Sequence, residues 1–140
     1  MGFSVDAAPW VGAVARVELT VTDADTAQSL GSGDVPVLGT PKLLALAEAA
    51  TVGALVRRLP PGWTTVGTRV ELEHRAATPI GGRVTVEARL AKADGRKLVF
   101  EIVARDGSQV IADGRVERVI VERHRFLEKA RGDAQQETHK

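Results

Sequence analysis

The sequence contains no cysteine, and only three histidines and one methionine occur among its 140 residues. Without cysteine the chain forms no disulfide, holds no metal through thiolates and offers no thiol nucleophile or redox dithiol. A metal site built on imidazoles would have to recruit His74, His124 and His139 from scattered places. Any catalysis therefore depends on hydroxyl, carboxylate and imidazole groups, and we expect neither a metal nor a redox cofactor.

An excess of charge of either sign is also missing, because 19 Lys and Arg residues face 18 Asp and Glu residues. This balance argues against electrostatic binding of nucleic acid. The longest apolar stretch, residues 43–56, contains Glu48 and is shorter than the roughly 20 residues that a membrane span needs. Residues 1–6 lack the basic and apolar regions of a secretory signal, so we expect a cytoplasmic protein without a membrane partner.

The length of 140 residues and the 44% content of hydrophobic residues fit one domain with its own core. We expect this domain to occupy residues 1–128. Residues 129–140 are polar and show no periodicity, so we expect them to form a disordered tail.

A long helix is predicted over residues 40–59. Thr40 is a favourable N-cap, Pro41 suits the first helical position, and Ala and Leu dominate the residues that follow. The segment 60–62, Pro-Pro-Gly, ends the helix. Because the helix is apolar almost all round, we expect it to be buried on most sides.

Five segments show the alternation of polar and apolar residues that is typical of strands. They are residues 14–22, 64–76, 83–92, 97–105 and 109–122. Asp-Gly pairs at 94–95 and 106–107 predict hairpins between the last three segments. The fold class is therefore α+β, with an antiparallel sheet of five or six strands wrapped around one central helix, which is the hot-dog architecture. Cystatin-like and ferredoxin-like arrangements suit this helix less well.

Glu48 is the only charged residue between Leu43 and Val56, and helical spacing aligns it with the apolar Leu44 and Val52. A lone buried carboxylate is costly without partners, which suggests a functional role. The alternative is that Glu48 lies on a narrow exposed stripe of the helix, although Ala45 and Ala49 fit such a stripe equally well. The sequence leaves both interpretations open.

His74 is the second unusual residue, since it shares the apolar phase of its strand with Val70 and Leu72. It is either a histidine at the edge of the core or a partner for Glu48. Gly67 lies in the opposite phase of the same strand and is compatible with a simple bulge.

Two runs of residues resemble the fluoroacetyl-CoA thioesterase family of hot-dog proteins. They are VLGTPKLLALAE at 37–48 and GTRVELEHRAATP at 67–79, followed by Gly82 and the segment 95–98. The specificity of the resemblance lies in the joint spacing of a threonine, a glutamate and a histidine, and it extends over roughly residues 14–128.

This resemblance implies a homodimer, possibly assembled into a tetramer, with the acyl thioester in a tunnel between subunits. Thr40, Glu48 and His74 match the catalytic residues of the family. Gly67 matches a glycine beside the acyl group and Arg118 an arginine near the same pocket. The fluoroacetyl-specific enzyme carries lid phenylalanines before its threonine, whereas residues 31–36 contain none. We therefore expect a different or broader acyl-CoA substrate.

The function implied is hydrolysis of a small or medium acyl-CoA to the free acid and CoA, with CoA present only as part of the substrate. Glu48 is expected to act as general base or as nucleophile, a choice that the sequence leaves open. His74 would protonate the departing thiolate, and Thr40 would hydrogen-bond the carboxylate or the attacking water. The alternative is a non-catalytic acyl-CoA binding module on the same fold; a hydratase is disfavoured because its Asp/His arrangement is absent.

Overall fold

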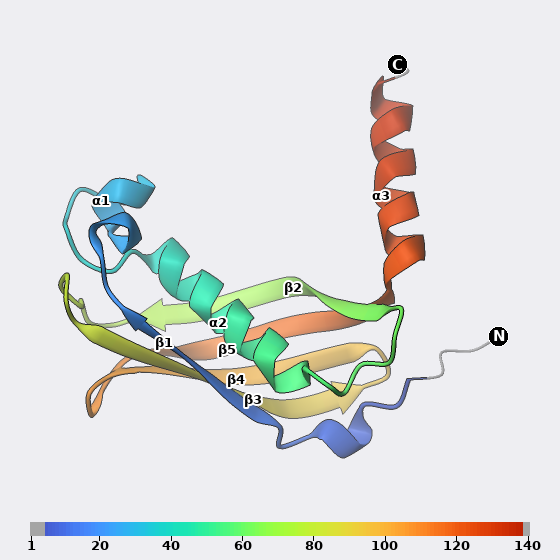
Figure 1. Cartoon of the computed structure of the whole chain (residues 1–140), viewed down its shortest axis with the longest axis horizontal. Helices are drawn as coiled ribbons and strands as arrows, with labels where there is room; N and C mark the ends of the chain where they lie inside the picture. Colours follow the sequence, from blue (N-terminus) through green and yellow to red (C-terminus); the bar gives the residue numbers. More distant parts are fainter. Residues whose placement is uncertain (1–4, 139–140) are drawn as a thin grey trace.

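The computed structural model of the chain, which describes residues 5–138, contains one curled antiparallel sheet (Figure 1). The strands in chain order are β1 (Val14–Thr20), β2 (Trp63–His74), β3 (Arg83–Asp94), β4 (Lys97–Asp106) and β5 (Gln109–Glu122). Their order across the sheet is β1-β3-β4-β5-β2, so β1 and β2 form the two edges. The expected hot-dog fold is thereby confirmed, with five strands in the sheet.

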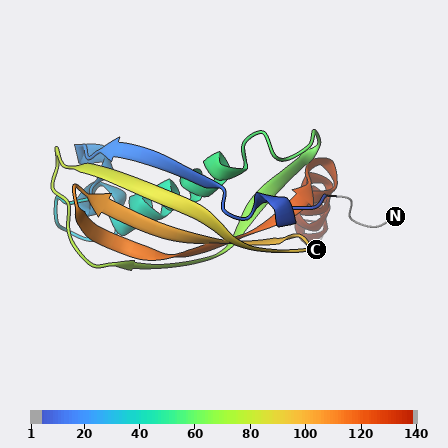
Figure 2. The ribbon, with the colours of Figure 1, turned by 90° about the horizontal axis from the view of Figure 1, so that it is seen from below.

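The long helix α2 (Thr40–Leu55) lies on the concave face of this sheet, as both ribbon views show (Figures 1 and 2). It packs chiefly against β3 and β1 and has fewer contacts with β5 and β2. The inner face of β2 is therefore less covered than that of the other edge, and Val70 and Leu72 on it are only partly buried. The site described below lies in this less covered half.

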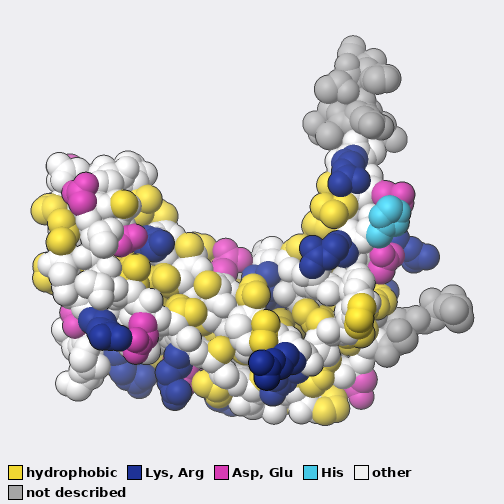
Figure 3. Space-filling model, viewed as in Figure 1, with side chains coloured by type: hydrophobic (Ala, Val, Ile, Leu, Met, Phe, Trp, Pro, Cys, Tyr) yellow, Lys and Arg dark blue, Asp and Glu magenta, His cyan; other side chains and the backbone are white. Residues whose placement is uncertain are grey.

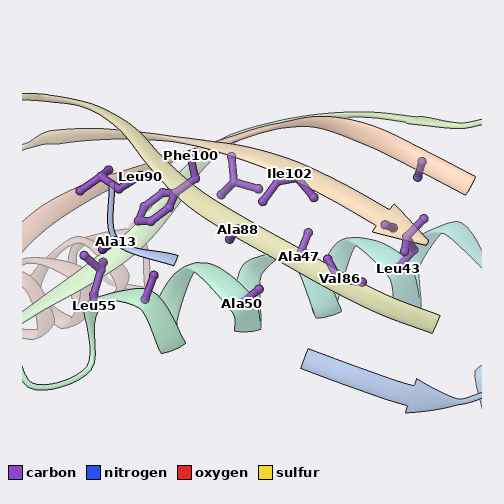
Figure 4. Packing of buried hydrophobic residues seen from close by; sticks show 14 of the residues in the cluster. Ala13, Leu43, Ala47, Ala50, Leu55, Val86, Ala88, Leu90, Phe100 and Ile102 are labelled. Carbon is purple, nitrogen blue, oxygen red and sulfur yellow. The ribbon is translucent and has the colours of Figure 1, made fainter. Parts of the chain in front are cut away.

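Small side chains let the helix approach the sheet closely. Ala47 and Ala50 of α2 are fully buried, and Figure 4 shows them facing Ala88 and Val86 of β3. Beyond them Phe100 fills the centre of the sheet's inner face and is also fully buried. Close packing of this kind fixes the position of α2 against the sheet, and with it the position of every side chain that α2 carries.

One stripe of α2 remains exposed, and this stripe is apolar. Ala45, Ala49, Val52 and Val56 follow one another at helical spacing and are all exposed, with Val52 at 48% and Val56 at 58%. Of the two possibilities that the sequence left open, the structure places Ala45 and Ala49 on the exposed stripe, and Glu48 lies beside the stripe and is half-buried.

Both ends of α2 differ from the sequence prediction. The N-cap is Gly39 rather than Thr40, which is itself the first helical residue. The helix ends at Leu55 instead of Leu59, because Val56 leaves the helical conformation and Arg57 adopts a left-handed one with φ 71°. Leu59 precedes Pro60, and a proline disfavours the helical conformation in the residue before it. The helix therefore ends before Leu59.

The connection between β1 and α2 is folded, although the sequence predicts only turns there. It contains the 3-10 helix η2 (Asp23–Asp25) and the short α1 (Ala27–Leu30). The buried carboxylate of Asp25 accepts hydrogen bonds from the backbone N–H and the hydroxyl of Thr22, both at 2.8 Å, and its backbone carbonyl accepts from the Gly39 N–H at 2.9 Å. The two bonds from Thr22 lower the pKa of the Asp25 carboxyl, and the bond from Gly39 ties the connection to the start of α2.

Residues 123–138 form the helix α3 (Arg123–Thr138), which departs from the expected disordered tail over 129–140. Strong helix formers such as Leu127, Lys129 and Ala130 explain the difference, since propensity supports a helix even without an apolar periodicity. Residues 139–140 lie outside the described part. The remaining element is the 3-10 helix η1 (Ala8–Trp10), and no helix within residues 5–138 is long and apolar enough to cross a membrane.

Candidate active site

The first pair of predicted site residues meets at the start of α2. The hydroxyl oxygen of Thr40 lies 2.8 Å from Nδ1 of His74 on β2. Because Gly39 occupies the N-cap position, the Thr40 hydroxyl is not engaged in capping the helix. The prediction that Thr40 caps α2 is therefore wrong, and the correction leaves its side chain free to bond the imidazole.

His74 lies on the inner face of the sheet, opposite the buried Ala112 of β5. Burial lowers the pKa of His74, so the ring is neutral at pH 7. Nε2 is shielded from solvent and has no hydrogen-bond partner of ordinary geometry within residues 5–132, while the backbone of Ala76 partly offsets the effect of burial on the pKa of the ring. A neutral imidazole with one ring nitrogen bonded and the other unbonded is suited to exchange a proton with a ligand.

A cleft of about 280 Å³ opens beside this pair. The connection before α2 forms one wall of the cleft, and the residues that follow His74 form the other. Apart from Leu38, the wall contributed by the connection carries short side chains, namely those of Ala27, Ser32, Gly33, Val35 and Val37.

The second pair, Glu48 and Arg118, lies further along α2. Nη1 of Arg118 donates to Oε2 of Glu48 at 3.3 Å. The Arg118 side chain is 8% exposed and that of Glu48 is 37% exposed, so the arginine lies beneath a carboxylate that still faces solvent. Burial lowers the pKa of Arg118, and the neighbouring Glu48 opposes that shift.

Gly67 completes the surroundings of Glu48. A Cβ at position 67 would overlap Oε2 of Glu48, so the carboxylate can take this position only because residue 67 is glycine. The sequence places Gly67 in the phase opposite His74, and this is corrected by a register shift between Gly67 and Arg69. The extra residue at the shift reverses the alternation, so Gly67 pairs with the buried Arg118 on the inner face.

Thr65 is a site residue that the sequence did not single out. Its hydroxyl accepts from Nε of Arg118 at 2.8 Å and its carbonyl accepts from Nη2 at 3.0 Å. Two of the three guanidinium nitrogens are thus fixed on β2, which directs the third toward Glu48. The only signal in the sequence is that Thr65 shares its phase with Gly67.

The five predicted residues therefore form two groups within one chain. Thr40 and Glu48 are eight residues apart, or about 12 Å along a helix. Within the described residues no hydrogen bond joins Glu48 to either Thr40 or His74. The two groups face the same side of the sheet but do not touch.

The other two histidines lie away from both groups. Nε2 of His124 on α3 lies 3.1 Å from Oε1 of Glu128, which is one turn further along the helix. His139 is outside the described residues. Among the side chains of residues 5–132, no group of three His, Asp or Glu is placed to hold a metal ion.

Comparison with known proteins gives a consistent result over most of the chain. The family model described as "Fluoroacetyl-CoA-specific thioesterase" matches residues 21–124. The fluoroacetyl-CoA thioesterase of Streptantibioticus cattleyicolor is 38% identical over 95 residues, which make up 68% of each protein.

Solved structures agree with this match. A structure of the fluoroacetyl-CoA thioesterase FlK superposes with a TM-score of 0.81 at 33% identity, covering 87% of this chain and 95% of that one. A thioesterase superfamily member from Thermus thermophilus has a TM-score of 0.86 at 27% identity, covering 93% and 96% of the two chains. A hot-dog-like protein from Thermanaerovibrio acidaminovorans has a TM-score of 0.83 at 26% identity, covering 93% and 97%.

Proposed function

This chain belongs to the fluoroacetyl-CoA-specific thioesterase family and is a hydrolase of acyl-CoA thioesters, and from that premise we propose that Thr40, Glu48 and His74 carry out the hydrolysis of a small or medium acyl-CoA. The observation that carries the proposal is the presence of two hydrogen-bonded groups between α2 and the inner face of the sheet, Thr40 with His74 of β2 and Glu48 with Arg118 of β5. One group supplies a carboxylate held by a buried arginine, and the other an imidazole bonded to a hydroxyl.

A complete site on this proposal requires two copies of the chain. The exposed apolar stripe of α2, the less covered inner face of β2 and the unpaired edge of β2 all lie on the same side of the molecule. A second copy that pairs with this side buries apolar surface and supplies hydrogen-bond partners for the edge strand. We therefore place a homodimer interface there.

Antiparallel pairing of the two β2 strands brings the two groups together. Gly67 and His74 lie on either side of the middle of β2, so a two-fold axis near residue 70 sets the Gly67 end of one strand beside the His74 end of the other. Glu48 of one subunit then faces Thr40 and His74 of the partner subunit. The dimer has two such sites.

The chemistry divides between the groups as follows. Glu48 removes a proton from water, which attacks the thioester carbonyl, or else attacks the carbonyl itself to form an anhydride that water then cleaves. In either route the C–S bond breaks and the sulfur leaves as a thiolate. The proton that this sulfur gains comes from the water consumed in the hydrolysis: the neutral imidazole of His74 first accepts it and then donates it to the sulfur, while Thr40 holds the imidazole in position. Neither route needs a metal or a redox cofactor.

The cleft beside Thr40 favours an acyl group other than fluoroacetyl. Residues 31–36 carry no phenylalanine, and the wall that they help to form has short side chains around a volume of about 280 Å³. Without an aromatic cover, the site has no evident means of selecting the smallest acyl groups. We expect it to accept short and medium chains alike.

The experiment is a panel of acyl-CoAs of increasing chain length, with thiol release followed by a thiol reagent. The enzyme contributes no background because it has no cysteine. Glu48→Gln preserves shape but removes the basic carboxylate, and we expect kcat to fall by about 10²-fold or more. Glu101→Gln, a change to an exposed strand residue that pairs with Arg89, is the matched control.

Two results would contradict the proposal at different levels. A Glu48→Gln variant with the wild-type rate would exclude the assigned role of Glu48. If no acyl-CoA released thiol above the uncatalysed rate while CoA esters still raised the melting temperature, the non-catalytic binding module would be the correct interpretation.

The shared site can be tested by mixing inactive variants. Glu48→Gln and His74→Asn are combined, unfolded and refolded together. If each site takes its glutamate and histidine from different subunits, heterodimers contain one intact site and the mixture regains about a quarter of the wild-type activity. If both residues act within one chain, mixing restores no activity.

A further inference from the structure

A buried carboxylate lies in the connection between β1 and α2, residues 21–39, and the proposed chemistry does not use it. Asp25 is 7% exposed, and of the Asp and Glu residues that the structure describes it is the one that is buried. A carboxylate removed from water is costly unless hydrogen bonds and a cation replace the lost hydration. The partners of Asp25 therefore show which segments of the chain it holds together.

Three segments meet at Asp25. Its Oδ2 accepts from the N–H and the hydroxyl of Thr22, at the beginning of the connection. Its Oδ1 lies 3.6 Å from Nζ of Lys42, in the first turn of α2. Its backbone carbonyl accepts from the N–H of Gly39, the N-cap of α2, at 2.9 Å. Asp25 thus contacts the chain on both sides of Thr40, one residue before it and two residues after it.

The start of α2 is packed closely against the connection. A Cβ on Gly39 would lie 3.0 Å from the backbone N of Ala27 and 3.0 Å from Cδ1 of Leu30, both in α1. The N–H of Ala27 is itself bonded to the carbonyl of Val37 at 2.8 Å, so this backbone is held in place. A displacement of the connection would therefore displace the start of α2 as well.

The connection is also bonded to the segment that follows His74. The N–H of Leu38 donates to the carbonyl of Thr78 at 2.8 Å. In Figure 3 the connection is the raised block at the left end of the molecule, and the surface falls beside it toward α2. The 2.8 Å bond between the Thr40 hydroxyl and Nδ1 of His74 thus forms where the connection joins the helix to the sheet.

We propose that Asp25 is a positioning residue of the active site, which sets the Thr40 hydroxyl against His74 by holding the chain on both sides of Thr40. The proposal rests on the proposed function, since the position of Thr40 matters to catalysis only if the Thr40–His74 pair takes part in hydrolysis. The first turn of a helix lacks intrahelical partners for its N–H groups and frays unless other contacts hold it. Thr40 is the first residue of α2, so its position depends on contacts of this kind.

The kinetic test is a double-mutant cycle. Asp25→Ala removes the side-chain contacts with Thr22 and Lys42, and we expect it to lower kcat by about 10-fold and to leave KM within about threefold. Asp25→Asn keeps an oxygen that accepts from Thr22, and its kcat should stay within about threefold of the wild type. In a Thr40→Val background, Asp25→Ala should change kcat by less than about twofold, because the hydroxyl that Asp25 positions is already absent.

A second measurement needs no substrate. The imidazole ¹⁵N signals of His74, assigned by their loss in His74→Asn, report the bonding at Nδ1. We expect the Nδ1 signal to move in Asp25→Ala in the same direction as in Thr40→Val, and to stay near the wild type in Asp25→Asn. Ile102→Val shortens a buried side chain of β4 and is the control for lowered stability. Its melting temperature should fall while kcat and the Nδ1 signal remain unchanged.

Thr22→Val removes one of the two bonds to the carboxylate and is measured in parallel, so that the test does not depend on the folding of Asp25→Ala. We expect it to lower kcat by about threefold and to move the Nδ1 signal in the same direction.

The positioning role is overturned if the Nδ1 signal is unchanged in these variants, or if the effects of Asp25→Ala and Thr40→Val on kcat multiply. The thioesterase proposal would remain intact in both cases. If the wild type hydrolyses no acyl-CoA, the proposed function fails, and the Nδ1 signals still decide whether Asp25 holds Thr40 against His74.

Discussion

Replacing Gly67 by alanine should displace the Glu48 carboxylate while leaving the fold intact. The added Cβ overlaps Oε2 of Glu48 and lies 3.5 Å from Nη1 of Arg118. The overlapped atom is the end of a half-exposed side chain and not backbone, so it can move aside. To restore an ordinary contact it must shift by on the order of 1 Å.

The expected magnitudes follow from this shift. The 3.3 Å bond between Arg118 and Glu48 is already long, so a further displacement removes it. Loss of a half-exposed charge-assisted bond costs about 1 kcal/mol of stability, or a few degrees in melting temperature for a domain of this size. Misplacing a catalytic group by this amount lowers kcat by about 100-fold, which corresponds to about 2.7 kcal/mol in the barrier.

The assay measures kcat for an acyl-CoA and the melting temperature of three alanine variants. Gly132→Ala on α3 meets no atom within 4 Å, so it should keep the wild-type kcat and leave the melting temperature unchanged or slightly higher, since alanine favours the helix. Gly114→Ala would overlap the backbone carbonyl of Glu71 and should lose stability before anything else. The reasoning is refuted if Gly67→Ala keeps its kcat, or if its stability falls as far as that of Gly114→Ala.

Four further results are expected. Thr40→Val removes the partner of His74 Nδ1 and should lower kcat by about 10–100-fold, whereas Thr40→Ser keeps the hydroxyl and should stay near the wild type. If the Val and Ser variants had the same kcat, the hydroxyl would have no role. Because burial lowers the pKa of His74, its contribution to stability is fully present above its unfolded value of about 6.5 and is lost as pH falls through the lower folded pKa. Urea unfolding at pH 5 and pH 7 should therefore show a smaller difference in His74→Asn than in the wild type, and an equal difference would contradict the assignment. Arg118→Lys cannot reproduce three bonds from one planar group, so we expect a loss of about 2–4 kcal/mol in urea unfolding together with lower activity, and a fully stable variant would be inconsistent with the network. Phe100→Ala should cost about 3–5 kcal/mol through the cavity it leaves, with a cost below about 1 kcal/mol arguing against its central position.

The elements of the fold could be predicted because their signals are local. Alternation over residues 83–92 and 97–105 identified β3 and β4 almost to their ends, and the Asp94-Gly95 turn identified the hairpin between them. The same local reasoning failed at the end of α2, because nothing in the apolar pattern marks the left-handed turn at Arg57. It also failed for α3, whose residues favour a helix without any apolar face to reveal it.

The candidate site was predicted in part. Glu48 and His74 were recognisable because a charged or titratable residue interrupts an apolar pattern, which a sequence displays directly. Thr65 was not, since a threonine on a strand is ordinary until its hydroxyl is seen to accept from Arg118. Gly67 was assigned to the wrong face, because side-chain alternation is counted along one strand whereas a bulge is created by pairing between two.

The sequence by itself determined the five strands, the long buried helix and the groups that are available for chemistry. Those properties depend on composition, periodicity and turn residues within short stretches of chain. Only the tertiary structure decided that the Thr40 hydroxyl bonds His74 instead of capping α2, and that Glu48 bonds Arg118 about 12 Å further along the helix. Such contacts join residues 34 and 70 positions apart, and they are set by how α2 packs across the sheet.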